Sequence, residues 1–182
     1  FNYAVDRIEK AGLSDMVTFK MQDYRDEKGT YDGIASIEMF EAVGEKYWST
    51  YFDTVRERLK PGARGTFQVI LVQDKRWHVY KRGVDFIQKY IFPGGMLPAP
   101  TILRETIRKA GLEVTRSVEF GQSYSDTLRR WHETFNEKWD QVAGLGFDDR
   151  FRRMWNFYLT SCAATFHSGN CDVTQITITR PT

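Results

Sequence analysis

Short apolar runs alternate along the chain with longer segments in which apolar residues recur every three or four positions. The runs at residues 17–21, 33–37 and 66–72 predict buried strands. Between the second and third runs, helical spacing of apolar residues predicts a helix over residues 45–59, and Lys60-Pro-Gly62 predicts its end. The apolar face of this helix consists of Tyr47, Trp48, Tyr51, Phe52, Val55 and Leu59.

The same alternation extends to both ends of the chain. A first helix, with Tyr3, Ala4 and Ile8 on one face, is predicted to end at Gly12. A later helix over residues 101–110 has Thr101 as a plausible N-cap and Gly111 as its end. After it the pattern predicts a strand at residues 112–120, two amphipathic helices over about 125–142 and 148–166, and an alternating strand at 172–179.

Residues 77–100 interrupt this rhythm. Bulky apolar residues there are followed by the irregular sequence Pro93-Gly-Gly-Met-Leu-Pro98. We interpret this segment as an insertion that could act as a substrate lid, and the helices over about 125–166 as a second, helical insertion. The length of 182 residues suits one domain with these insertions.

Alternating strands and helices predict an α/β fold with a mostly parallel sheet and helices on both faces. The last strand, rich in Thr and Ile, could insert antiparallel near the edge of the sheet. No Gly-x-Gly-x-Gly loop follows a first strand, and the chain starts at Phe1 within a helix-like pattern. We therefore expect an N-terminal truncation and only part of a cofactor site.

Composition excludes several classes of protein. The formal net charge of +2 gives no reason to expect a nucleic-acid-binding surface. The two cysteines are too few for a disulfide framework and lack a metal-ligand spacing, which favours a reduced, cytoplasmic setting. No apolar run is long enough to span a bilayer, so any membrane contact is expected to be peripheral. Basic clusters in the second half are typical of a solvated face or of a surface that meets lipid headgroups.

Polar residues gather where two predicted strands end. Residues 31–44 pass from an apolar strand into acidic and aromatic residues and then Gly44, and Met21-Gln-Asp-Tyr-Arg-Asp26 forms a similar strand end. Because α/β proteins place their chemistry at such ends, we expect both segments to contribute to one rim of a ligand cleft.

Several motifs are specific in combination. They are Met21-Gln-Asp-Tyr-Arg-Asp26, Ser36-Ile-Glu-Met-Phe-Glu-Ala-Val-Gly44, Tyr47-Trp-x-x-Tyr-Phe52, Leu59-Lys-Pro-Gly62, Tyr90-Ile-Phe-Pro-Gly-Gly-Met-Leu-Pro98 and Arg150-Phe-x-Arg-Met-Trp-x-x-Tyr-Leu159. In this order they resemble the C-terminal part of the cyclopropane-fatty-acyl-phospholipid synthase and mycolic acid cyclopropane synthase family. The resemblance runs through essentially the whole chain, and it implies a Rossmann-like class I methyltransferase that uses S-adenosylmethionine.

The resemblance also implies a cofactor site. Gln22, Asp23 and Tyr24 would line the adenine, with Asp23 as the hydrogen-bond acceptor, and Ile37 would flank the methionine end of S-adenosylmethionine. The residues alone leave another interpretation open, in which Asp23 is a turn or helix-cap carboxylate. The glycine loop and the ribose-binding acidic residue of the family would lie upstream of Phe1.

Methyl transfer to an alkene generates a carbocation, and a base must then remove a proton. The resemblance implies that a bicarbonate ion serves as this base, held by Glu41, Tyr124 and the backbone of Ile70, with Gln68 at the position of the family's histidine. Gln68 can donate a hydrogen bond but cannot exchange a proton near neutral pH, so a methylene or methyl-branched product is an alternative. From the residues alone, Glu41 could merely cap a helix, Tyr124 could be a packed aromatic, and Gln68 could be an outward polar residue.

Cys162 corresponds to a family cysteine that has been regarded as an active-site residue, although a helical cysteine is ordinarily inert core. The resemblance implies an unsaturated phospholipid at the inner face of the membrane as substrate and a cyclopropane fatty acid as product. A methyltransferase for a small soluble acceptor and a non-catalytic binding domain are the alternatives. A sheet with open edges could also pair two copies into a homodimer.

Overall fold

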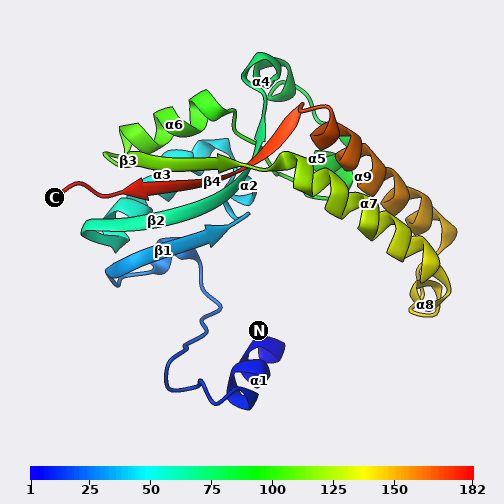
Figure 1. Ribbon diagram of the computed structural model, residues 1–182, viewed down its shortest axis with the longest axis horizontal. Coiled ribbons are helices and arrows are strands. Elements are labelled where there is room, and N and C mark those ends of the chain that lie inside the picture. Colours follow the sequence, from blue (N-terminus) through cyan, green and yellow to red (C-terminus); the bar gives the residue numbers. More distant parts are fainter.

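The computed structural model describes residues 1–182 and is built around a four-stranded sheet (Figure 1). The strand order is β1 (Tyr31–Ile37), β2 (Leu59–Val72), β4 (Cys171–Thr179) and β3 (Glu113–Glu119). β1 pairs parallel with β2, whereas β4 pairs antiparallel with both β2 and β3. Three strands therefore share one direction, and the final strand inserts antiparallel one place from the edge, as predicted.

Two helices cover one face of the sheet, α3 (Trp48–Arg58) and α6 (Pro100–Lys109). Alternation along β2 directs every second side chain to this face, where Phe67 packs with Phe52 of α3. The main core forms there from eighteen buried residues, of which the largest fully buried are Phe40, Phe52, Phe67, Leu59, Leu103, Ile107, Ile176, Ile178 and Val69.

Helices also reach the opposite face, but only at one end. α7 (Gly121–Glu137) and α9 (Asp149–His167) run side by side away from the sheet, with the short α8 (Trp139–Ala143) near their far end (Figure 1). A second buried cluster joins Leu128 of α7 and Leu159 of α9 to Val173 of β4, and Ile70 packs against it. Elsewhere on this face β2 and β4 carry the polar cross-strand pairs Thr66 with Thr177 and Gln68 with Gln175, flanked by the exposed apolar residues Ile37 and Val118.

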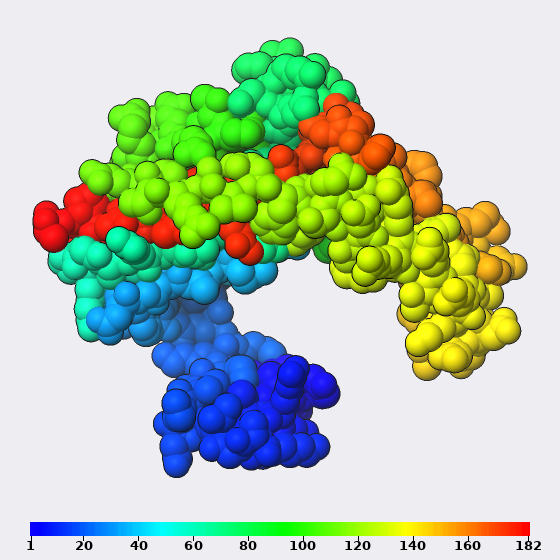
Figure 2. Space-filling view, in the orientation of Figure 1, coloured from blue at the N-terminus to red at the C-terminus, as the bar shows by residue number.

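The N-terminal residues differ from the prediction. Residues 17–21 form no strand, and the preceding helix α1 (Asn2–Lys10) has no buried residue and stands apart from the sheet (Figures 1 and 2). Met16 and Met21 are 82% and 84% exposed. The predicted strand is wrong because a strand needs a neighbour for its backbone, and β1 pairs only with β2. The segment before Asp26 is likewise not a strand end but a loop leading to a 3-10 turn, η1 (Tyr24–Asp26).

Other predicted boundaries shift by a few residues. α6 begins at Pro100 with Ala99 as its N-cap instead of Thr101, because proline is well suited to the first helical position. Its end at Gly111 is confirmed, with φ +73° at that glycine. The helix predicted over 125–142 starts earlier, at Gly121, and is divided at Lys138 into α7 and α8.

The segment expected to be an insertion, residues 77–100, contains the short helix α5 (Phe86–Tyr90), and a second short helix, α4 (Asp74–Tyr80), begins three residues before this segment. Asp85 and Gln88 close a capping box at the start of α5. Phe86 then packs edge-on against Phe157 of α9, with ring centroids 4.7 Å apart. The chain returns to the sheet at Pro98, whose carbonyl accepts a hydrogen bond from Val72 N–H.

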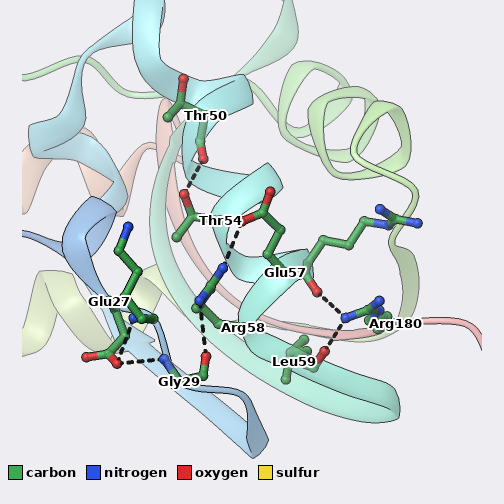
Figure 3. A network of polar contacts seen from close by, with 10 residues as sticks. Glu27, Gly29, Thr50, Thr54, Glu57, Arg58, Leu59 and Arg180 are labelled. Carbon is green, nitrogen blue, oxygen red and sulfur yellow. Dashed lines mark hydrogen bonds and ion pairs between the residues drawn. The ribbon is translucent and has the colours of Figure 1, made fainter.

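Arginines fix the C-terminal end of α3 (Figure 3). Arg180 donates from one guanidinium nitrogen to the carbonyl oxygens of Arg56 and Leu59, at 3.0 and 2.7 Å. Arg58 reaches the carbonyl of Gly29, just before β1. Arg180 thereby supplies a partner for carbonyls at the end of α3, which a helix end leaves unpaired. Together the two arginines connect this end of α3 to the residues that follow β4 and to those that precede β1.

Candidate functional site

Three elements bring four of the predicted site residues together. Glu41 lies in α2 (Phe40–Val43), directly after β1, while Gln68 and Ile70 lie near the end of β2. Tyr124 comes from the first turn of α7. Because β1 and β2 are parallel, with Ile37 opposite Gln68, their carboxyl ends meet at one rim of the sheet.

Glu41 is fixed through both its side chain and its backbone. Its Oε1 accepts a hydrogen bond of 2.6 Å from Ile70 N–H, and its carbonyl accepts one of 2.9 Å from Met96 N–H. The helix-cap interpretation is wrong, since the N-cap of the following helix α3 is Tyr47 and no side chain caps either α3 or α2. Oε2 is buried without a partner. Burial raises the pKa of Glu41; the Ile70 hydrogen bond opposes this shift and the charge of Glu38 adds to it.

Gln68 is the centre of a polar network on the open part of the sheet face. Its Nε2 donates to Glu38 Oε1 at 2.8 Å and to the Tyr124 hydroxyl at 2.6 Å. Its Oε1 accepts a hydrogen bond of 2.9 Å from Gln175 Nε2 on the neighbouring strand. Since the amide oxygen is held by Gln175, the amide NH2 group is directed toward Glu38 and Tyr124.

Tyr124 combines a packed ring with a functional hydroxyl. The ring contacts Phe120 and Phe166, with centroids 5.8 and 5.4 Å away. The hydroxyl donates to Glu38 Oε1 while it accepts from Gln68. The ring of Tyr124 is therefore a packed aromatic, as one interpretation expected, while its hydroxyl belongs to the polar network of Gln68 and Glu38.

Glu38 is the site residue that the sequence analysis missed. It is the one non-glycine residue with a positive φ, +50°, a conformation that costs about 1–3 kcal/mol. Its N–H continues the β1–β2 pairing by donating to the Gln68 carbonyl at 2.9 Å. The available signal was its place as the first residue after β1, but nothing in the sequence marks its backbone conformation or the direction of its carboxylate.

The groups that the resemblance implies for bicarbonate already have partners within the chain. Ile70 N–H donates to Glu41, and the donors of Gln68 and Tyr124 are both directed to Glu38. Only Glu41 Oε2 is without a partner, and it is an oxygen rather than a donor for an anion. The arrangement therefore does not fit a separate bicarbonate ion.

The expected cofactor residues fall into two places. Ile37 is 61% exposed and lies opposite Gln68 on the rim. Asp23 caps η1 and forms an ion pair with Arg25 at 2.7 Å, which lowers the pKa of its carboxyl to about 2, and Gln22 donates to Glu27. The cap interpretation of Asp23 thus holds for this geometry, while its adenine contact stays a prediction.

Tyr24 lies closer to the core than its two neighbours. Its ring packs edge-on against Tyr51 with centroids 5.3 Å apart, and the Tyr51 hydroxyl donates to Ser36 Oγ at 2.7 Å. Tyr24 is therefore connected through α3 to β1. Its contact with adenine remains a prediction.

Cys162 lies in α9, half-buried beside the second cluster. Burial, and to a lesser extent the charge of Asp85, raises the pKa of its thiol to about 11. Burial likewise raises the pKa of Tyr158, one turn earlier, to about 12. A protonated thiol is a weak nucleophile, so the surroundings favour the inert-core interpretation, and a catalytic role for Cys162 is still only a prediction.

Comparison with known proteins identifies the family. The model of the family described as mycolic acid cyclopropane synthetase matches residues 1–176. A tuberculostearic acid methyltransferase of Mycobacterium tuberculosis is 39% identical over 97% of this chain and 42% of its own length. A cyclopropane-fatty-acyl-phospholipid synthase of Escherichia coli is 35% identical over 90% of this chain and 41% of its own length.

Solved structures agree on the fold. A mycolic acid cyclopropane synthase complexed with S-adenosylhomocysteine superimposes with a TM-score of 0.83 at 24% identity, covering 96% of this chain and 65% of that chain. The chain thus spans about two fifths of the length of these curated relatives and about two thirds of this structure. Its fold is that of the Rossmann-like class I methyltransferases, and the chain belongs to the mycolic acid cyclopropane synthetase family.

Proposed function

We propose that the full-length protein transfers a methyl-derived carbon from S-adenosylmethionine to the double bond of an unsaturated fatty acyl chain in a phospholipid, forming a cyclopropane. The observation that carries this proposal is the cluster of Glu38, Glu41, Gln68 and Tyr124 at the rim of a class I methyltransferase sheet. Family membership supports lipid methyl transfer, because the two curated relatives are named for fatty acids or fatty acyl phospholipids.

S-adenosylmethionine would supply an electrophilic methyl group on a sulfonium. Exposed Ile37, opposite Gln68, would flank its methionine end, and Gln22, Asp23 and Tyr24 would form the adenine side. Catalysis by Glu41, Gln68 and Tyr124 would rest on orientation and on fixed dipoles near the developing positive charge.

The acyl chain would enter between the segment over residues 77–100 and α9. Aromatic side chains join the two: Phe86 packs on Phe157, and Phe92 lies 6.3 Å from Tyr158 between centroids. Met96 of the same segment holds the Glu41 carbonyl, so a lid there would be in direct contact with the rim. This contact supports the lid role proposed for residues 77–100.

The same segment suits a peripheral contact with phospholipid. Val79, Val84 and Phe92 are 77%, 74% and 58% exposed, and Lys81, Arg82 and Lys89 lie among them along the chain. Exposed apolar side chains beside cations match the lipid boundary, where acyl tails lie below anionic headgroups. None of the helices combines the length and the hydropathy needed to cross a membrane.

The test uses the full-length protein with isotope-labelled S-adenosylmethionine and vesicles of unsaturated phospholipid, followed by mass spectrometry of the lipids. We expect label in the acyl chain with a gain of CH2. Chromatographic comparison with cyclopropane and methylene standards then separates the two isomeric products. Label in a small soluble acceptor but not in lipid would contradict the proposal, and so would bound cofactor without any transfer.

A methylene product is the second candidate, because Gln68 stands where the resemblance implies a histidine. The altered base region could divert the carbocation from ring closure to loss of a proton after a hydride shift. Replacing Gln68 by His should then increase the cyclopropane share of the product. An unchanged product ratio would exclude this explanation of product choice.

A further inference from the structure

We propose that Glu38 is the catalytic base of this protein, so that the chain itself provides the carboxylate for which a bicarbonate ion would otherwise be recruited. The inference rests on the proposed function, since it concerns the base that alkene methylation requires. It goes beyond that function because it assigns a residue and predicts independence from bicarbonate.

The first argument is that Glu38 already occupies the anion site, meaning the position between Gln68 and Tyr124 where the resemblance implies a bicarbonate ion. Glu38 Oε1 accepts hydrogen bonds from both Gln68 Nε2 and the Tyr124 hydroxyl. Two convergent donors are what an oxyanion needs, and here they converge on a side chain. All hydrogen bonds of this carboxylate involve Oε1, and Glu38 is exposed, which leaves Oε2 available to a substrate.

The second argument is backbone strain at the same residue. Glycine would adopt the positive φ at position 38 without strain, yet a glutamate occupies it. None of the ion pairs in the structure involves Glu38, and the hydrogen-bond partners of its carboxylate are Gln68 and Tyr124. The conformation directs the carboxylate across the end of β2 toward α7.

The third argument is the lack of another suitable base nearby. The unpartnered oxygen of Glu41 is buried, and its other oxygen is held by Ile70 N–H. The Cys162 thiol is half-buried, and the three histidines lie on α4, on α7 and at the end of α9, outside this network. Glu38 is the remaining exposed carboxylate in the cluster.

The proposed step conserves atoms and electrons. The alkene π pair forms a carbon–carbon bond to the methyl group as the sulfur–carbon bond breaks, with that bond's electron pair remaining on sulfur. The positive charge moves to the other alkene carbon. Glu38 removes a proton from the added carbon, and the released C–H pair forms the third ring bond. The proton then leaves from the exposed carboxylate to water.

The test compares the full-length parent with Glu38→Gly and Glu38→Gln in carbon dioxide-free buffer. The parent should keep its activity, whereas both variants should lose about 10²-fold or more in turnover, the scale of a lost general base. Added bicarbonate should restore Glu38→Gly, which opens the site, but not Glu38→Gln, whose amide fills it. Glu57→Gln, a change at an exposed ion-paired carboxylate, is the matched control.

Binding of ¹³C-labelled bicarbonate, followed by NMR, gives a readout that does not depend on turnover. Glu38→Gly should bind the ion, and the parent and Glu38→Gln should not. Bicarbonate binding to the parent, or full activity of Glu38→Gln without bicarbonate, would overturn the inference. If the parent itself does not methylate lipid, the proposed function fails, and the binding comparison still decides whether Glu38 occupies the position of the bicarbonate ion.

Discussion

The two faces of the sheet use alternate residues of one strand for different purposes. On β2, Phe67 and Val69 are buried against α3 and α6, whereas Gln68 and Ile70, which alternate with them, belong to the candidate site. The first face is apolar and close-packed. The second carries a buried carboxylate oxygen without a partner and a strained glutamate. Stability and chemistry are thus separated by one residue step, because strand side chains alternate.

The difference between the two faces shows where this fold tolerates groups that lower its stability. A large core on one face stabilises the sheet, so the rim can hold groups that oppose stability. Substitutions on the two faces should therefore affect different measured quantities. Changes on the apolar face should reduce the free energy of unfolding, and changes on the polar face should reduce turnover.

The largest effect is expected from Phe67→Ala, which tests the apolar face. Phe67 is 1% exposed, and truncating a buried phenylalanine costs about 3–5 kcal/mol in the free energy of unfolding. Urea denaturation should show a lower midpoint with a similar slope. Phe92→Ala, at a residue that is 58% exposed, is the control and should change stability far less. Equal effects of the two substitutions would refute the separation of the faces.

Tyr124→Phe tests the polar face with a single oxygen atom. The ring contacts with Phe120 and Phe166 remain, but Glu38 and Gln68 lose the hydroxyl. We expect turnover to fall about 10²-fold, while the free energy of unfolding changes by about 1 kcal/mol or less. Methyl-transfer kinetics and urea denaturation on one preparation measure both. A stability loss as large as that of Phe67→Ala would mean that the network is chiefly structural.

Glu41→Gln sharpens the comparison through pH. Burial raises the folded-state pKa of Glu41 above its ordinary value of 4.5, so the ionised side chain opposes folding. Parent stability should fall as pH rises from the ordinary pKa through the raised one. The stability of Glu41→Gln relative to the parent should therefore increase over that window and level off above it. Urea denaturation at a series of pH values measures this.

The matched control for the pH experiment is the exposed Glu57→Gln, whose parent residue pairs with Arg58 at 2.8 Å. It should not reproduce the rise with pH that is expected for Glu41→Gln. A stability difference between Glu41→Gln and the parent that is constant from about pH 4 to about pH 8 would show that Glu41 has no raised pKa.

The smallest effect is expected from Cys162→Ala. The thiol is half-buried and its raised pKa, about 11, keeps it protonated at neutral pH. Turnover should stay within about twofold of the parent, with at most a modest loss of stability from the removed sulfur. Methyl-transfer kinetics check this, with Cys171→Ala as the control at the other half-buried cysteine. A large loss specific to Cys162→Ala would restore the nucleophile interpretation.

Local pattern was sufficient for the order of most elements, including the existence of the final strand β4, because apolar spacing is set within each segment. It failed at residues 17–21, where the outcome depends on whether another strand lies alongside. The division of the predicted helix at Lys138 was likewise not visible in the apolar spacing.

The sequence by itself determined the alternation of strands and helices and the apolar face of β2, and its resemblance to the family singled out Glu41, Gln68 and Tyr124. Only the tertiary structure decided that Glu38 joins them. Its two donors are 30 and 86 residues away along the chain, and its carboxylate reaches them through a positive φ that no residue spacing specifies. The physical reason is that periodicity is a local property, whereas convergent hydrogen bonds depend on how distant segments are placed in space.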